Sequence, residues 1–300
     1  MAGRGEASGC DPLFRARFSP GDFPDSEPKQ IETAQGKAHQ GEDDMKRQKQ
    51  AIHFIILLSV FLATASVHAV TGDEILARVD AVLSAPEDGT STAEMILVDR
   101  SGRTKQRRMQ MWTRYYKDRD DWSLVKFVSP PEERDLGFLT LADDKMYLYL
   151  PAFDRVRRIA SHARKESFAG SDLSNDDLST GKYTDHFSAA ITKETDQEYV
   201  LELTRRPGSN RIYPRSLVWV NKENFTIPRM ELFDNHDRLW KTFEGEYEKI
   251  QGYWTLTRLT MTDVKKEHKT HMKMADIEFD VGLDDRIFTE RYLKRKTRSD

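Results

Sequence analysis

The residues best suited to bind a transition metal are Glu267, His268 and His271, which lie close together in the chain. Zinc sites commonly place two histidines one turn apart on the same face of a helix. Here the sequence from Lys269 to Phe279 alternates as a strand does, and residues three apart on a strand point to opposite faces. We therefore interpret both histidines as solvated turn residues and predict no metal site.

A second candidate for cation binding is an acidic loop, formed by Asp172, Asn175, Asp176 and Asp177. A calcium loop of the EF-hand type requires a glycine at its sixth position and a closing glutamate, and both are missing. We interpret these residues as caps that begin a short helix.

Motifs for catalysis are also missing. The chain has neither a G-x-S-x-G nucleophile elbow nor a glycine-rich phosphate loop, and the Ser-x-x-Lys string from Ser123 to Lys126 falls inside a predicted strand. A formal net charge of -3, with both signs mixed along the chain, gives no field that would attract nucleic acid. We predict that the protein is not an enzyme, needs no cofactor and binds no nucleic acid.

Two unusual groups of side chains remain near the middle of the chain. The first is a basic stretch, Arg155, Arg157, Arg158, Arg164 and Lys165. It either protects a sheet edge with charge or meets anionic headgroups or an acidic partner at a membrane. The second is Phe168 and Leu173, two apolar residues in an otherwise polar loop. They would either anchor this loop or shut it over an apolar cavity.

The elements that carry these residues are mostly β-strands. Thr71 and Glu74 have the spacing of a capping box, and apolar residues at helical spacing follow, so we predict one amphipathic helix over 71–84. From Ser91 onward, short alternating runs are separated by turn residues, as in the hairpin 139–150. Such short connections favour antiparallel neighbours. The sequence predicts a mainly β protein with few helices, built on a single curved antiparallel sheet.

The alternation within these strands suggests that both faces of the sheet are covered. Met109 and Met111 share one face, and Val125 and Phe127 face opposite to Leu124. By the same rule, Leu259 and Met261 should face opposite to Leu256. A sheet with one solvated face would not need apolar groups on both sides. One face could pack on the helix while the other lines a cavity; an ordinary β-sandwich core is the alternative.

The N-terminal part of the chain has the features of an export signal. Lys46 and Arg47 precede an apolar run, and Val67-His68-Ala69 ends it, so we predict a signal peptide over 45–69 with cleavage after Ala69. Residues 1–44 have no periodic apolar pattern, and we expect them to be disordered or to precede the true start at Met45. The single cysteine, Cys10, lies before this signal, so the domain over 70–300 contains no thiol.

The central motifs resemble a known family. A strand, the turn Ala142-Asp-Asp-Lys145, an aromatic strand, Pro151 and then a Gly-Ser-Asp insertion at 170–172 resemble the outer-membrane lipoprotein-sorting proteins, the periplasmic Lol-type carriers. The resemblance runs from Thr71 to Tyr292. It implies an incomplete half-barrel that holds helices against its concave face.

The resemblance also implies a function. The expected protein is a periplasmic monomer that binds lipid or lipoprotein acyl chains in an apolar cavity and carries them from an inner-membrane transport complex to an outer-membrane acceptor. The alternative is a periplasmic module of the same architecture that senses lipid and regulates a membrane partner. We expect the helix over 71–84 and the insertion over 161–180 to close the cavity. The predicted ligand-binding residues are Met109, Met111, Val125, Phe127, Leu139, Leu148, Trp219, Phe168 and Leu173.

Overall fold

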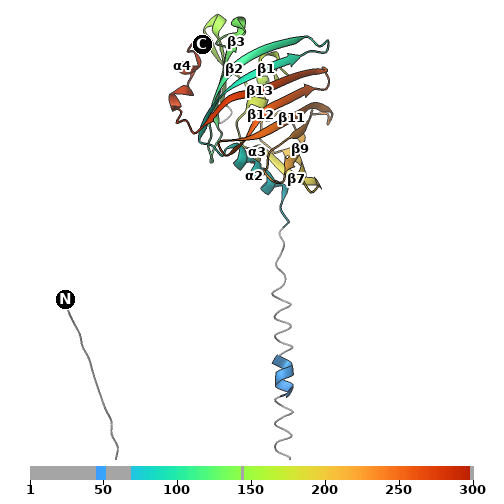
Figure 1. Cartoon of the computed structure of the whole chain (residues 1–300). Helices are drawn as coiled ribbons and strands as arrows, with labels where there is room; N and C mark the ends of the chain where they lie inside the picture. The colour runs from blue at the N-terminus through green and yellow to red at the C-terminus, as the bar shows by residue number, and fades with distance from the viewer. Residues whose placement is uncertain (1–44, 52–68, 143–144, 298–300) are drawn as a thin grey trace, which may run out of the picture. The chain divides into compact units, whose positions relative to one another are not determined.

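The computed structural model of the chain describes residues 45–51, 69–142 and 145–297 (Figure 1). The chain divides into two compact units, Met1–Val67 and His68–Asp300. In the first unit, residues 45–51 are helical and exposed. The predicted N-terminal extension and most of the predicted signal peptide lie outside the described residues. Within the described ranges, every helix is too short or too polar to cross a lipid bilayer.

The second unit is built on one antiparallel sheet of thirteen strands, in the order β6-β5-β4-β3-β2-β1-β13-β12-β11-β10-β9-β8-β7. Every pair of neighbouring strands is antiparallel. The strands are β1 (Asp88–Val98), β2 (Thr104–Arg114), β3 (Trp122–Ser129), β4 (Gly137–Leu141), β5 (Lys145–Leu150), β6 (Arg155–Arg158), β7 (Phe187–Glu194), β8 (Glu198–Arg205), β9 (Arg215–Asn221), β10 (Arg229–Phe233), β11 (Leu239–Ile250), β12 (Tyr253–Asp263) and β13 (His268–Phe279). Because β6 and β7 are the two edges and do not pair with each other, the sheet is not closed into a barrel. The prediction of a curved antiparallel sheet is confirmed.

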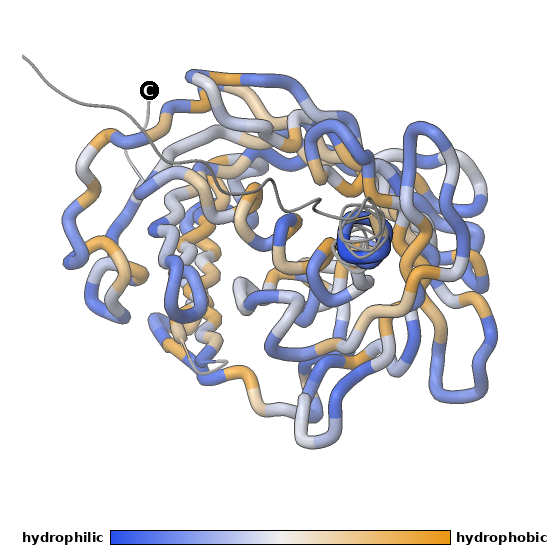
Figure 2. The backbone as a smooth tube through the Cα atoms, turned by 90° about the horizontal axis from the view of Figure 1, so that it is seen from below, coloured by the Kyte–Doolittle hydropathy of each residue, from blue (hydrophilic) through white to orange (hydrophobic). Residues whose placement is uncertain are grey.

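One connection runs from one edge of the sheet to the other and packs against the concave face. The chain steps outward from β1 to β6 at one edge, and after β7 at the other edge it steps back to β13, which pairs with β1. The connection from β6 to β7 must therefore pass from one edge to the other. It consists of the short 3-10 helices η3 (Ser161–Lys165), η4 (Phe168–Gly170) and η5 (Asp176–Leu178), followed by the helical turn α3 (Tyr183–His186). Figure 2 shows the sheet curving around the segments in its interior.

Helix α2 (Gly72–Leu83) covers part of the concave face near β7. The side chain of Thr71 accepts a hydrogen bond from the Glu74 amide, and the Glu74 carboxylate accepts one from the Thr71 amide, so the predicted capping box starts this helix. Its buried residues Ile75, Leu76 and Val79 pack in one cluster with apolar side chains of β8 and β9. The predicted helix over 71–84 is thus present with nearly the predicted ends.

The opposite, convex face is covered at β3 to β5 by the C-terminal part of the chain. Leu124 and Leu139 pack there against Phe288 and Leu293, which belong to the segment formed by η6 (Asp285–Ile287) and α4 (Glu290–Leu293). The buried Lys126 ammonium donates a hydrogen bond to the Leu293 carbonyl at 2.8 Å. Both faces of this part of the sheet are therefore buried, as the alternation of apolar residues predicts.

All three hydrophobic clusters draw their residues from between Val70 and Leu293. The unit that begins at His68 therefore carries its own core, which is what an independently folding domain requires.

Candidate lipid-binding face and its cover

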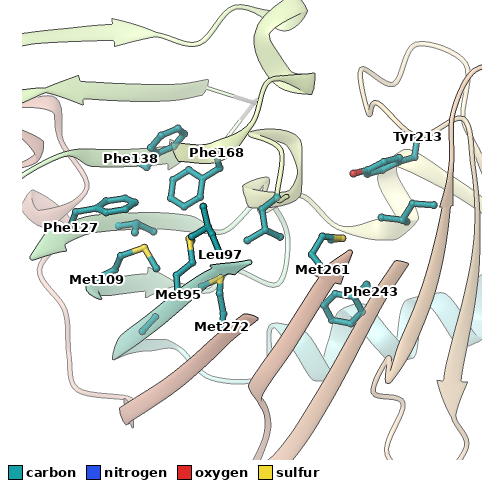
Figure 3. Packing of buried hydrophobic residues seen from close by; sticks show 14 residues of the cluster. Met95, Leu97, Met109, Phe127, Phe138, Phe168, Tyr213, Phe243, Met261 and Met272 are labelled. Atoms are coloured by element: carbon teal, nitrogen blue, oxygen red, sulfur yellow. The ribbon is translucent and has the colours of Figure 1, made fainter. Parts of the chain in front are cut away.

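The largest hydrophobic cluster lies on the concave face of the sheet and is rich in methionine and phenylalanine (Figure 3). Its buried members are Ala93, Met95, Leu97, Met109, Val125, Phe127, Phe138, Phe168, Leu173, Tyr213, Leu232, Phe243, Met261 and Met272. Methionine side chains are flexible and polarizable, so a methionine-rich surface can adapt to ligands of different shape. We call the sheet residues of this cluster the apolar face.

Most of the predicted ligand-binding residues lie together in this cluster. Met109, Val125 and Phe127 belong to the apolar face, and Phe168 and Leu173 pack onto it from the interior segment. Met111 and Leu148 are partly buried against the same cluster.

Two predicted ligand-binding residues lie elsewhere. Leu139 is fully buried on the convex face beside Leu124, because the neighbouring Phe138 takes the inward position on β4. Trp219 lies on β9 between Val218 and Val220, whose side chains pack with α2, and the Arg229 guanidinium stacks over the Trp219 ring at 4.3 Å. The structure does not bring Leu139 or Trp219 to the apolar face.

Residues 161–180, which we call the cover, occupy the space over the apolar face. Phe168 is only 1% exposed, and its ring packs edge-on against Phe138 with centroids 4.7 Å apart and against Phe127 at 5.6 Å. The Phe168 amide donates to the Leu173 carbonyl at 2.8 Å, which closes a tight loop. Two hollows in the described structure, of about 270 and 370 Å³, are lined neither by the cover nor by any predicted ligand-binding residue. Because Phe168 and Leu173 are buried against the apolar face, the cover is closed in this structure.

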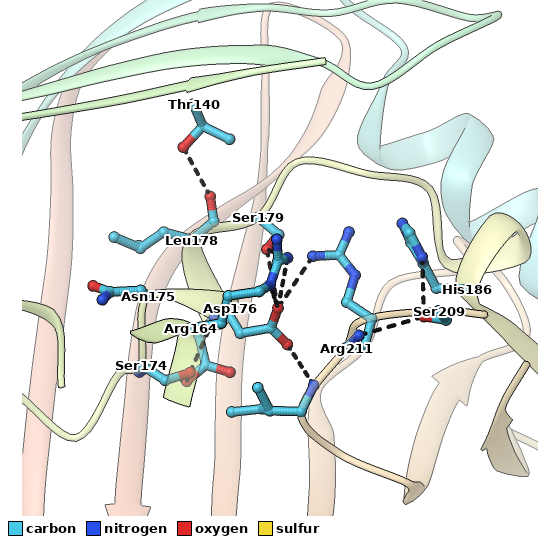
Figure 4. Close-up of polar contacts among 12 residues, drawn as sticks. Thr140, Arg164, Ser174, Asn175, Asp176, Leu178, Ser179, His186, Ser209 and Arg211 are labelled. Carbon is cyan, nitrogen blue, oxygen red and sulfur yellow. Dashed lines mark hydrogen bonds and ion pairs between the residues drawn. The ribbon is translucent and has the colours of Figure 1, made fainter. Parts of the chain in front are cut away.

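Buried ion pairs hold the polar side of the cover (Figure 4). The Asp176 carboxylate lies 2.7 Å from the Arg164 guanidinium, and both side chains are 3% exposed. Arg211 lies 3.5 Å from the same carboxylate, which also accepts the Ile212 amide at 3.0 Å. Asp176 thus ties the start of the cover, its end and the β8–β9 connection together.

Asp177 makes a second set of contacts, with the other half of the sheet. It accepts the Tyr213 hydroxyl at 3.0 Å and the Lys241 ammonium at 3.2 Å, and it also accepts the Ser174 amide at 2.7 Å. Burial, together with the nearby Asp177 carboxylate, raises the pKa of Tyr213 well above its ordinary value. Tyr213 is therefore a neutral donor at physiological pH.

Asp172 makes the third set, with β13. Its carboxylate accepts the Thr270 hydroxyl at 2.7 Å and lies 2.8 Å from Nδ1 of His268. His268 is thus partly buried and paired, and our interpretation of it as a solvated turn residue was wrong. His271 lies beside Thr260 instead, with its Nδ1 2.9 Å from the hydroxyl.

The acidic loop is therefore a set of anchors. Asp172, Asp176 and Asp177 face protein cations, hydroxyls and amides, while the Asn175 side-chain amide donates to the Ala163 carbonyl at 3.0 Å. Among the described residues, no group of three or more His, Cys, Asp and Glu side chains is placed to hold a metal ion.

The end of the cover is tied to α2. Asp121, at the start of β3, lies 2.9 Å from the Lys182 ammonium, and Ser84 donates to the same carboxylate at 3.2 Å. Burial raises the pKa of Asp121, although Lys182 and the hydrogen bonds to the carboxylate oppose this shift. Next to it, Asp80 of α2 accepts the Tyr183 amide at 2.8 Å. The residues that directly follow the cover are thus held to α2.

The cations and hydroxyls that anchor the cover were missed by sequence reasoning. Lys241 and Thr270 come from β11 and β13, far along the chain, and their spacing carries no local motif. The one signal available was the density of aspartates in the cover, because buried carboxylates require partners.

Comparisons with known proteins agree with this architecture. A protein-family model described only as an uncharacterized protein family matches residues 119–295, which is more than half of the chain. No curated protein matches the sequence.

Several solved structures are similar. A DUF1329 family protein from Desulfovibrio piger is 29% identical, with a TM-score of 0.70, and the match covers 74% of this chain and 97% of that one. An outer membrane lipoprotein-sorting protein domain from Vibrio parahaemolyticus is 27% identical, with a TM-score of 0.69, and covers 75% of this chain and 98% of its own. A LolA superfamily protein from Nitrosomonas europaea shares the fold at 23% identity, with a TM-score of 0.62, over 75% of this chain and 100% of its own. The chain thus belongs to the family that the matching protein-family model describes, and it shares the fold of the lipoprotein-sorting protein domain and of the LolA superfamily protein.

Proposed function

We propose that this protein is a periplasmic carrier that binds the acyl chains of lipids or lipoproteins on its apolar face after the cover has moved away. The observation that carries the proposal is the contrast between the apolar face and the cover. A methionine- and phenylalanine-rich sheet face is shut by a segment without regular strands. This segment buries two large apolar anchors, Phe168 and Leu173, while Ala169 and Leu178 are only partly buried against the same cluster.

The magnitudes favour displacement of the cover by a long acyl chain. Full burial of a phenylalanine or leucine side chain contributes roughly 1.5–3 kcal/mol, so Phe168 and Leu173 together hold the cover with about 3–6 kcal/mol. An acyl chain of roughly 16 carbons, at about 0.8 kcal/mol for each CH₂, gains about 13 kcal/mol when it leaves water. A long acyl chain therefore outweighs both anchors, whereas a chain of only a few carbons does not.

The polar anchors suit a cover that opens. Burial of an ion pair such as Arg164–Asp176 removes both charges from water, and this desolvation offsets most of their attraction. When the cover opens, water solvates both groups again, so opening costs less than for an apolar plug of the same size. The ion pairs therefore define the closed position of the cover without making it irreversible.

The location and the partners follow from the same proposal. A lipid that must pass between two membranes needs a protein to shield its acyl chains, and the predicted signal peptide would deliver the chain to the periplasm. We expect an exported protein that begins at Val70, with a membrane complex as donor and an outer-membrane protein as acceptor. The N-terminal sequence of the exported protein tests this cleavage site.

A disulfide between the cover and β13 tests the proposal directly. The Asp172 amide nitrogen and Thr270 Oγ1 are 2.9 Å apart, so the two Cα atoms lie within the ~7 Å that a disulfide allows. The sequence contains one cysteine, Cys10, and the unit from His68 onward has none, so Asp172→Cys with Thr270→Cys introduces a single pair. We expect the reduced protein to take up and exchange a fluorescent fatty acid and the oxidised protein to do neither.

The same protein in its reduced form is the matched control, because both states carry the same substitutions. Equal uptake in the two redox states would show that acyl chains do not enter beneath the cover. Native mass spectrometry of the wild-type protein purified from its own periplasm would identify the lipid class, and repeated purification without any bound lipid would count against a carrier.

A further inference from the structure

We propose that the outer edge of β6, together with the adjacent C-terminal segment, is a docking surface for bilayers with anionic headgroups. The surface consists of Phe153, Arg155, Arg157, Arg158 and residues 294–296, and we call it the basic edge. It combines six exposed basic side chains with one exposed aromatic ring.

The first observation is the unpaired charge on β6. This strand pairs only with β5, so its other side is open to solvent. Arg155, Arg157 and Arg158 are all exposed, and no carboxylate in the described part of the chain forms an ion pair with any of them.

The second observation is that the C-terminal segment adds charge at the same place. The Lys294 ammonium lies 2.9 Å from the Asp154 carboxylate in the turn before β6, and Val156 packs in the same cluster as Leu293. Lys294, Arg295 and Lys296 are exposed. The two segments, far apart in the sequence, thus form one basic surface.

The third observation distinguishes this surface from simple protection of a sheet edge. Charged side chains on an edge strand prevent pairing with other chains, and this alone would explain the arginines. It does not explain Phe153, which is 70% exposed, more than any other exposed large hydrophobic residue in the described part of the chain. Aromatic rings flanked by basic residues are typical of surfaces that insert into the headgroup region of a membrane.

The position of the basic edge also relates it to the cover. β6 ends at Arg158, and the cover begins at Ser161. A bilayer bound at the basic edge would therefore lie beside the start of the cover, where an acyl chain could pass between the membrane and the apolar face. This last step rests on the proposed carrier function, whereas binding to the bilayer does not.

Vesicle sedimentation tests the docking surface with the chain from His68 onward, because residues before it include the basic and apolar parts of the predicted signal peptide. We expect binding to vesicles that contain phosphatidylglycerol, weakening as sodium chloride is added, and little binding to pure phosphatidylcholine. Each basic side chain near an anionic bilayer strengthens binding roughly fivefold, so replacing Arg155, Arg157 and Arg158 by glutamine should weaken it on the order of 100-fold.

The matched control removes the same charge elsewhere. Lys105, Lys193 and Lys249 are exposed on β2, β7 and β11, and their replacement by glutamine should leave vesicle binding within a few-fold of wild type. Equal losses in the two triple variants would show that binding depends on net charge alone and would overturn the proposal. Failure of the wild-type chain to bind phosphatidylglycerol vesicles would also overturn it, in favour of edge protection or an acidic protein partner.

A single label tests the aromatic residue. With no other thiol in the unit, Phe153→Cys and Val281→Cys can each carry an environment-sensitive dye; Val281 is also an exposed apolar residue, at 43%. We expect the dye at residue 153, but not at residue 281, to brighten and shift to the blue when anionic vesicles are added. A dye at residue 153 that stays in a watery environment while the protein binds would refute the assignment of Phe153.

Discussion

Removal of the Phe168 ring should open the cover and strengthen lipid binding. Phe168 is 1% exposed and packs against Phe138 and Phe127. Truncation of a buried phenylalanine to alanine costs about 3–5 kcal/mol. This cost applies to the closed cover but not to the open one, so in Phe168→Ala the equilibrium between the two states should shift toward the open state by a factor of roughly 100 or more.

The consequence for binding follows from the population of the open state. If wild-type closure is worth a few kcal/mol, only a small fraction of molecules can accept lipid, and the apparent affinity is reduced by that fraction. Phe168→Ala should remove this reduction and bind a fluorescent fatty acid up to about 100-fold more tightly. Hydrogen exchange of the Phe168 and Asn175 amides, which donate to Leu173 and Glu166 within the cover, should accelerate by a similar factor.

Leu139→Ala is the matched control. Leu139 is also fully buried, but on the convex face, so its truncation should lower the global free energy of unfolding by about 2–5 kcal/mol without touching the cover. We expect unchanged lipid affinity and unchanged exchange of the cover amides in this variant. If the cover amides respond to Leu139→Ala as strongly as to Phe168→Ala, the cover opens only when the whole domain unfolds, and the reasoning above fails.

Three further predictions concern the apolar face, the buried Asp121 carboxyl group and the C-terminal segment. Met111→Glu, at a partly buried position beside the cluster, should abolish fatty-acid binding while the denaturant midpoint falls only modestly; a variant that unfolds would instead mark this position as packed core. Burial raises the pKa of Asp121, so the folded protein binds the carboxyl proton more tightly than the unfolded chain does. The wild type should therefore lose stability relative to Asp121→Asn as the pH rises from roughly 3.9, the ordinary pKa of aspartate, to the higher pKa of the folded protein. Parallel pH profiles of the two proteins in thermal unfolding would contradict that shift. Lys126→Met should release the C-terminal segment, because the Leu293 carbonyl loses its buried donor at a cost of about 1–3 kcal/mol, and limited proteolysis should then cut after α4 while the wild type stays intact.

Sequence reasoning succeeded where the cause of a structure is local. The capping box at Thr71 and Glu74 determines the start of α2, and simple alternation correctly places Val125 and Leu124 on opposite faces of β3. It failed on β12, where Leu256 packs in the same cluster as Leu259 and Met261. A bulge between Glu246 and Tyr247 leaves Thr257 without a partner in the register, and this extra residue reverses the alternation.

Other features depend on the whole topology and leave no local trace. β7 leaves no apolar alternation in the sequence, because its edge position leaves most of its residues polar or exposed. The pairing of His268 with Asp172 joins residues 96 positions apart, and it exists only because the cover crosses the interior to β13. Alternation along β4 showed that Leu139 and Phe138 face opposite ways, but it could not show which of them faces inward.

Both edge strands of the open sheet are kept from pairing with another strand, and by different means. At β7, the start of α2 blocks the strand: a Cβ atom on Gly72 would lie 2.3 Å from the Ala189 carbonyl oxygen, and the Asp73 carboxylate accepts the Ala189 amide at 2.8 Å. At β6, the exposed arginines disfavour the addition of another strand. If β6 and β7 paired with each other, the sheet would close around the connection between them and fix the cover in place. Under the proposed carrier function, the glycine at the helix start and the arginines at the edge therefore serve the same end, because the cover must remain free to leave the apolar face.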